Sequence, residues 1–141
     1  MPARTIRLLH VEDDLAQRRF VSHHLASIGE YHFDILTAEG EEAALHEFNG
    51  GGVDFVILDY HLTQGNGLSC LQKLRGRDRI VPIITVSGVA TPEIAAELLQ
   101  VGADDFISKK DLSNDVLARS VRDALARADA WRQRTGGREQ A

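Results

Sequence analysis

Four short apolar segments of the sequence are each followed at once by residues that could do chemistry. The acidic triplet at 12–14 follows the first of them, and Asp59 follows another. Ser87 and the pair Lys109-Lys110 follow the last two. If these segments are parallel strands of an open α/β sheet, their carboxyl ends meet at the edge where such sheets bind ligands. The sequence therefore predicts a site made of carboxylates, a hydroxyl and an amine.

Crowded carboxylates repel one another, and a divalent cation with oxygen ligands is the natural compensation. Mg²⁺ fits this donor set better than zinc, and it usually shares its remaining positions with water and phosphate oxygens. We therefore expect phosphoryl transfer in which Ser87 and Lys109 help to neutralise the transferred group. A carboxylate can itself be the nucleophile. Asp59 follows the most hydrophobic segment and is the best placed for this role.

The segments that position these residues alternate between strand and helix patterns, which is typical of βα units around a parallel sheet. Strands are predicted at 6–11, 33–37, 54–58, 82–86 and 105–108. Helices are predicted at 15–28, 41–48, 67–74, between Pro92 and Gly102, and from Ser113 to at least Trp131. Asp14 with Gln17 resembles a capping box, and Thr91 is an expected N-cap before Pro92.

Length and composition favour one domain. The chain has 141 residues, of which 43% are hydrophobic, and this is enough for a real core. We assign residues 1–131 to the domain and expect 132–141 to form a flexible tail.

The formal net charge is −5, and the short arginine-rich C-terminal region is a weak nucleic-acid signal, so we expect no direct nucleic-acid partner. The lone Cys70 is expected to be a helix residue.

The sequence contains no apolar run long enough to cross a bilayer, and its first residues do not match a signal peptide. We therefore expect a cytoplasmic protein without a membrane partner. His23, His24 and His46 have no metal-ligand spacing and are expected to be surface residues.

Four motifs in the same order resemble the receiver domain of bacterial response regulators, of the chemotaxis-regulator-like kind, which act in two-component signal transduction. They are Val11-Glu12-Asp13-Asp14, Val56-Ile57-Leu58-Asp59, Pro82-Ile83-Ile84-Thr85-Val86-Ser87-Gly88 and Gly102-Ala103-Asp104-Asp105-Phe106-Ile107-Ser108-Lys109. The resemblance covers residues 6 to about 128. It implies an α/β fold with a flavodoxin-like, doubly wound, five-stranded parallel sheet in the order 2-1-3-4-5, with five helices.

The same resemblance implies a phosphorelay in which Asp59 accepts a phosphoryl group from a phosphohistidine. The donor would be a sensor histidine kinase or a histidine phosphotransfer protein. Asp13 would bind Mg²⁺ directly, Glu12 would act mainly through water, and Asp59 and the backbone carbonyl of His61 would complete the metal ligands from the protein. The His61 side chain has two possible roles. It is either an ordinary surface histidine or a group that lies over the site and changes the rate at which the aspartyl phosphate is hydrolysed.

After transfer, the resemblance implies that Ser87 follows the phosphoryl group, Lys109 pairs with it and Phe106 changes rotamer as the switch residue. The face made by the fourth helix, fifth strand and fifth helix would then repack and be read by a downstream effector protein. Such a protein catalyses only its own phosphorylation and dephosphorylation, so we do not expect an enzyme acting on other substrates. We expect a monomer or a weak dimer, with the region of Trp131 as either an interface or a frayed end.

Three positions depart from the family's commonest pattern. Thr63 stands where a proline often follows the acceptor, and Asn66 replaces a frequent acid. Lys110 replaces a proline that often forms a cis bond after the lysine, and we expect a trans bond here because a non-proline cis peptide costs about 3 kcal/mol.

Two other functions compete with the phosphoacceptor. A pseudo-receiver, an interaction module that keeps the fold without phosphate control, would be expected to lose one of the five polar site residues, and all are present. A phosphatase with an aspartyl-phosphate intermediate needs a second acid two residues after the nucleophile, where this chain has His61. A flavodoxin is disfavoured because the first strand lacks a following hydroxyl- and glycine-rich phosphate loop.

Overall fold

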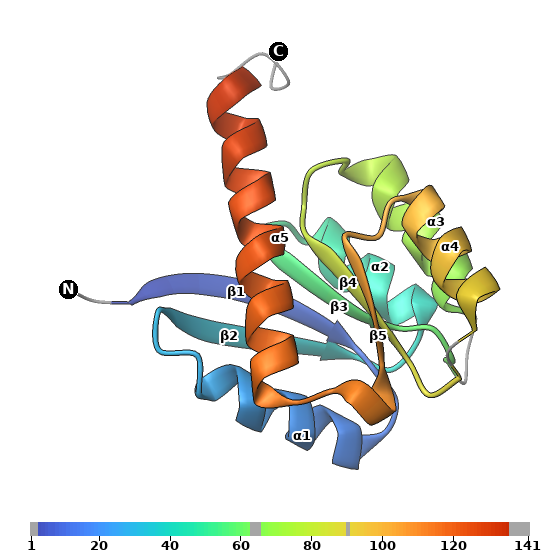
Figure 1. The fold of residues 1–141 in the computed structure, drawn as a ribbon. Coiled ribbons are helices and arrows are strands. Elements are labelled where there is room, and N and C mark those ends of the chain that lie inside the picture. The colour runs from blue at the N-terminus through green and yellow to red at the C-terminus, as the bar shows by residue number, and fades with distance from the viewer. Residues whose placement is uncertain (1–2, 63–65, 90, 136–141) are drawn as a thin grey trace.

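The computed structural model describes residues 3–62, 66–89 and 91–135, and it shows one parallel sheet covered by helices on both faces (Figure 1). The strands are β1 (Arg4–Val11), β2 (Tyr31–Ala38), β3 (Phe55–Asp59), β4 (Ile83–Ser87) and β5 (Asp105–Ser108). The helices are α1 (Leu15–Ala26), α2 (Glu41–Asn49), α3 (Gly67–Arg77), α4 (Pro92–Val101) and α5 (Asn114–Thr135), with a 3₁₀ turn, η1 (Lys109–Asp111), before α5.

The strand order is β2-β1-β3-β4-β5, and every neighbouring pair is parallel. This confirms the predicted order. The chain goes first from β1 outward to β2 and then returns to place β3 on the other side of β1, so the direction of winding reverses between β1 and β3. Ligands of open α/β sheets bind at such a reversal, outside the carboxyl ends of the strands.

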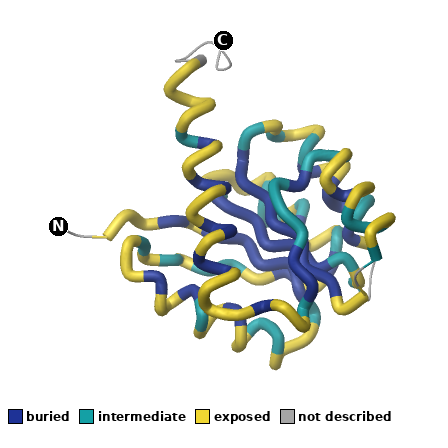
Figure 2. The backbone as a smooth tube through the Cα atoms, in the orientation of Figure 1, coloured by how far each residue is buried: buried dark blue, intermediate teal, exposed yellow. Residues whose placement is uncertain are grey.

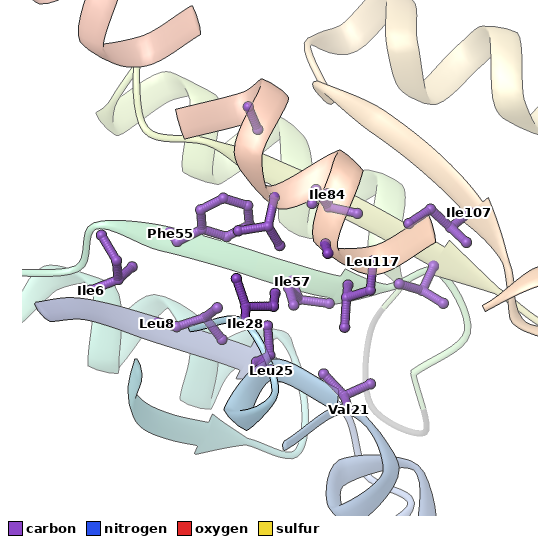
Figure 3. Packing of buried hydrophobic residues seen from close by; sticks show 14 of the residues in the cluster. Ile6, Leu8, Val21, Leu25, Ile28, Phe55, Ile57, Ile84, Ile107 and Leu117 are labelled. Atoms are coloured by element: carbon purple, nitrogen blue, oxygen red, sulfur yellow. The ribbon is translucent and has the colours of Figure 1, made fainter. Parts of the chain in front are cut away.

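Alternating strand residues supply two separate hydrophobic cores. On one face, Ile6, Leu8 and Ile57 pack against α1 and α5, which contribute residues such as Leu25 and Leu117 (Figure 3). The opposite face packs against α2, α3 and α4, and its members include Leu9, Val11, Val56, Leu58, Leu71 and Leu98. All five residues of β3 are buried, and Figure 2 shows the central strands as the buried middle of the molecule. A strand that is covered on both faces has a continuous run of apolar residues in its sequence, as β3 does.

Helix ends follow the expected capping chemistry with one exception. Thr91 caps α4 by accepting a hydrogen bond from Ile94 N, and Gly102 ends it with a φ of 126°, a conformation that favours glycine. The predicted capping box at α1 is wrong. The Asp14 carboxylate caps Ala16 N at 3.0 Å, but Asp14 N donates to Glu12 Oε2 rather than to Gln17.

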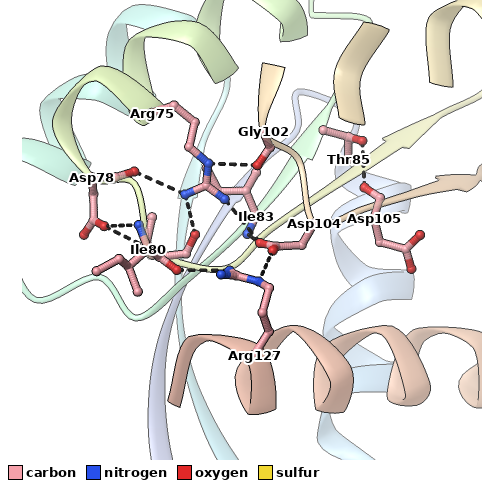
Figure 4. Close-up of polar contacts among 10 residues, drawn as sticks. Arg75, Asp78, Ile80, Ile83, Thr85, Gly102, Asp104, Asp105 and Arg127 are labelled. Atoms are coloured by element: carbon pink, nitrogen blue, oxygen red, sulfur yellow. Dashed lines mark hydrogen bonds and ion pairs between the residues drawn. The ribbon is translucent and has the colours of Figure 1, made fainter. Parts of the chain in front are cut away.

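A network of polar contacts closes the end of the sheet that lies away from the predicted site (Figure 4). Arg75 of α3 donates to the carbonyls of Gly102 and Val81 at 2.8 and 2.7 Å, and it pairs with Asp104 at 3.2 Å. Arg127 of α5 also pairs with Asp104. The network therefore joins α3, α5 and the segments that lead into β4 and β5.

Cys70 is buried in α3, as expected for a helix residue. Helix α5 continues to Thr135, so the helix extends four residues beyond the predicted domain boundary at Trp131. Residues 136–141 of the predicted tail lie outside the described residues, as does Thr63. None of the helices in the described ranges combines the length and apolar character needed to cross a membrane.

Candidate phosphoryl-transfer site

The structure brings the predicted polar residues together at the carboxyl edge of the sheet. Glu12 and Asp13 directly follow β1, Asp59 is the last residue of β3, and Lys109 directly follows β5. The ammonium Nζ of Lys109 lies 3.2 Å from Glu12 Oε1 and 3.3 Å from Asp59 Oδ2. Residues that are far apart in sequence thus converge at the reversal between β1 and β3.

Three carboxylates form the centre of the site. Glu12, Asp13 and Asp59 each offer an oxygen, and these oxygens all lie within 4.8 Å of one another. Glu12 is 2% exposed and Asp59 is 3% exposed, while Asp13 is partly exposed. The site is therefore closed on the side of the two buried acids and open to solvent on the side of Asp13.

The electrostatics show that Lys109 alone does not balance these charges. Burial, followed by the nearby negative charge of Asp59, raises the pKa of Glu12 to about 7. Burial alone would lower the pKa of the Lys109 ammonium, but Asp59 and Glu12 outweigh it, and the pKa of Lys109 is raised. The site therefore contains one cationic side chain, that of Lys109, and three acidic side chains.

This donor set fits a magnesium ion. Carboxylate oxygens at mutual distances of a few ångströms are the ligands that Mg²⁺ prefers, and the partly open side leaves room for water or phosphate oxygens. The raised pKa of Glu12 has the same physical origin, an excess of negative charge that a dication would relieve. His61 N donates to Asp59 Oδ1 at 3.2 Å, so the residue that carries the predicted carbonyl ligand is hydrogen-bonded to Asp59.

Ser87 is fully buried, and its hydroxyl bonds with its own loop. The Oγ donates to the carbonyl of Val89 at 2.7 Å and accepts from Val89 N at 3.1 Å. Among the described residues, no hydrogen bond joins Ser87 to Asp59 or Lys109. Phe106 of β5 is partly buried and packs against the core formed with α2, α3 and α4.

Gly67 is part of the site's support, and the sequence analysis missed it. A Cβ at this position would lie 2.5 Å from Tyr60 Cα and 2.8 Å from Asp59 O. Gly67 N also donates to Tyr60 O at 2.9 Å. The first residue of α3 therefore packs directly against the backbone of Asp59 and Tyr60. The dipeptide Asn66-Gly67 is the signal for it, since Asn66 caps α3 by accepting from Ser69 N at 2.8 Å.

Three histidines lie in different surroundings. His10 is a strand residue, as expected, but it is only 3% exposed, and burial together with Arg18 and Lys109 lowers its pKa to about 4. His24 was predicted to be an ordinary surface residue. It is half-buried instead, and its ring pairs with the side-chain oxygen of Asn114 at the start of α5. The His61 ring packs edge-on against Tyr60, with 4.9 Å between ring centroids.

Comparison with known proteins gives one consistent family. The profile of the response regulator receiver domain matches residues 8–122. The chain is 30% identical to the probable transcriptional regulator ycf27 of Porphyridium aerugineum over 87% of its own length and 49% of the relative's. It is also 30% identical to the phosphate regulon transcriptional regulatory protein PhoB of Klebsiella pneumoniae, over 80% of this chain and 49% of PhoB. The chain thus spans about half the length of these curated relatives.

A solved structure supports the same assignment. The signal receiver domain of a putative Luxo repressor protein from Vibrio parahaemolyticus superposes with a TM-score of 0.83 at 26% sequence identity. The match covers 94% of this chain and 98% of that one. Fold, profile and relatives agree, and the chain belongs to the family of response regulator receiver domains of two-component systems.

Proposed function

We propose that this domain accepts a phosphoryl group on Asp59 in a magnesium-dependent reaction. The donor is a phosphohistidine on a sensor histidine kinase or a histidine phosphotransfer protein in the cytoplasm. The observation that carries the proposal is the contact of Lys109 with both Asp59 and Glu12, beside Asp13, at the reversal point of the sheet.

In this reaction an oxygen of the Asp59 carboxylate forms a bond to phosphorus while the bond between phosphorus and the donor imidazole breaks. The imidazole leaves and takes up a proton, and Asp59 becomes an aspartyl phosphate. Lys109 is already within hydrogen-bond distance of Asp59, so its ammonium can follow the charge onto the phosphoryl oxygens without a large movement.

Glu12, Asp13, Asp59 and the carbonyl of His61 would hold Mg²⁺, which supplies charge neutralisation on the phosphoryl oxygens when it is bound. The domain catalyses only its own phosphorylation and dephosphorylation. It has no second acid two residues after Asp59, where a phosphatase of the aspartyl-phosphate class would carry its general acid.

The output depends on Ser87. Its hydroxyl is bonded to Val89 in the structure and must leave this partner to reach a phosphoryl group on Asp59. That movement would shift the loop between β4 and α4 and open space for a new rotamer of Phe106, which changes the face formed by α4, β5 and α5. A downstream effector protein would read this face.

The experiment is to incubate the protein with acetyl phosphate, with and without Mg²⁺, and to follow its intact mass. Wild type should gain one phosphoryl group only with Mg²⁺, and Asp59→Asn should gain none. Asp34→Asn is the matched control, because Asp34 is an exposed residue of β2 away from the site. It should behave as wild type.

If wild type stays unmodified with acetyl phosphate and also with phosphohistidine donors, the proposal is wrong. The domain would then be the alternative considered above, an interaction module whose partner binding does not depend on phosphate. Modification of Asp59→Asn at the rate of wild type would place the phosphoryl group on a different residue.

A further inference from the structure

A groove separate from the acidic site lies between α1 and β2, at the outer edge of the sheet. It has a volume of about 480 Å³, within the range of small-molecule sites in proteins. Residues of α1, β1 and β2 line it, among them His10, Leu15, Arg18, Arg19, Ile35 and Thr37. Helix α1 and strand β2 contact each other along this edge, where no further strand follows β2 (Figure 1).

One polar atom of the groove is buried without a hydrogen-bonding partner, and the ring of His10 forms no hydrogen bond with another described residue. His10 has a relative exposure of only 3% and lines the groove. The Nε of Arg18 is buried and has no partner, although Nη2 of the same guanidinium pairs with Glu39 at 3.6 Å and donates to the carbonyl of Asp13 at 3.5 Å. Buried polar groups in proteins are normally hydrogen-bonded, so the unpaired Nε of Arg18 calls for a partner.

The charge of the groove is opposite to that of the molecule. The chain carries a net charge of −5, yet none of the groove's lining residues is acidic, and two of them are arginines. Leu15 and Ile35 add an apolar surface beside these cations. Arginine binds carboxylate and phosphate groups through its planar set of donors. The lining thus matches a ligand with an anionic head and an apolar body.

We propose that this groove binds a small organic anion, a carboxylate or phosphate group attached to an apolar body. The anionic group pairs with Arg18 and Arg19, and the apolar part lies against Leu15 and Ile35. A ring nitrogen of His10 at the base of the groove bonds to a polar atom of the ligand. None of the residues that line the groove belongs to the acidic cluster, although Arg18 also donates to the backbone carbonyl of Asp13 at 3.5 Å.

The test is an amide NMR titration of the full chain in metal-free buffer with three probes: benzoate, phenylphosphonate and benzyl alcohol. Benzoate or phenylphosphonate should shift the signals of Arg18, Arg19 and Thr37 in a saturable way. Benzyl alcohol has the apolar body without the charge and should bind about tenfold more weakly or worse. Comparison of the two anions shows which head group the site prefers.

Arg19→Gln should weaken binding of the better anion by about tenfold. Arg19 is exposed, so the fold should tolerate this change. Arg79→Gln is the matched control, because Arg79 is an exposed arginine outside the groove, and it should bind as wild type. His10→Phe should weaken binding while circular dichroism shows that the fold is kept.

Three results would overturn the proposal. The first is shifts that do not saturate or that map elsewhere, and the second is equal binding of benzyl alcohol and benzoate. The third is binding of a glutamate-rich peptide to these residues when neither small anion binds, which would assign the groove to an acidic segment of a partner protein.

Discussion

Lys109 and Asp59, fifty positions apart in the chain, form an ion pair with 3.3 Å between Nζ and Oδ2. The same ammonium contacts Glu12, so one cation bridges two buried acids before any phosphoryl group arrives. Asp59, the proposed acceptor, therefore lies in a site that already pairs negative charge with a cation.

Replacing Lys109 with Gln should slow phosphorylation by acetyl phosphate on the order of 100-fold, because one group that neutralises the transferred phosphoryl oxygens is lost. Intact-mass time courses measure this rate. Lys110→Gln is the matched control, since Lys110 is the exposed neighbour in η1. Equal slowing in both variants would mean that the effect comes from net charge and not from the ion pair.

Gly67→Ala should lower the free energy of unfolding by about 1–3 kcal/mol, because the added methyl group would overlap the backbone at Tyr60 and Asp59. It should also slow phosphorylation, since the acceptor's backbone has to move. Urea unfolding and mass time courses give the two values. Gly76→Ala lies on the same helix with no atom within 4 Å of the new Cβ. It should be neutral or slightly stabilising.

Ser87→Ala should still accept a phosphoryl group but should lose the conformational response. The structure pairs the Ser87 hydroxyl with Val89, and only a side chain that can exchange this partner for the phosphoryl oxygens couples the site to the loop. Amide NMR spectra with and without acetyl phosphate and Mg²⁺ would show this as smaller shifts around Phe106. Shifts equal to those of wild type would contradict the assigned role. Ser22→Ala, an exposed serine of α1, is the control.

His10 should make the protein less stable in acid. Its pKa is about 4 in the folded protein against 6.5 for a free histidine, because the ring is buried and lies near Arg18 and Lys109. Between these two values the unfolded chain binds a proton that the folded chain does not, so stability is lost as pH falls from 6.5 toward 4. The loss is up to about 3 kcal/mol.

Urea unfolding at several pH values measures this loss. His10→Phe cannot titrate and should show a shallower fall in stability between neutral pH and pH 4 than wild type does. His32→Phe changes an exposed histidine of β2 and should keep the slope of wild type. If His10→Phe keeps that slope as well, other groups account for the acid sensitivity.

The elements that carry the site could be predicted because their sequence patterns are strong. The enclosed strand β3 reads as an unbroken apolar run that ends at Asp59, and Gly102 marks the end of α4. The family resemblance added the strand order, which local patterns do not contain. Strand β2 was harder to predict, because it lies at the edge of the sheet and only one of its eight residues is buried. The structure extends it by two residues at its start and one at its end.

Other features could not be predicted because they depend on contacts between distant segments. The close approach of Gly67 to the backbone of Tyr60 follows from how α3 returns to the sheet. The pair between His24 and Asn114 needs α1 and α5 side by side. The capping box failed because the buried Glu12 carboxylate accepts the hydrogen bond from Asp14 N that Gln17 was expected to accept.

The identity of the phosphorylated residue can be measured directly by trapping. After incubation with acetyl phosphate and Mg²⁺, borohydride reduces an aspartyl phosphate to homoserine, and tandem mass spectrometry of the peptides locates the change. We predict homoserine at position 59 alone, dependent on Mg²⁺. Homoserine at another position, such as 13, or a phosphoryl group that borohydride does not remove, would contradict the proposal that Asp59 is the acceptor.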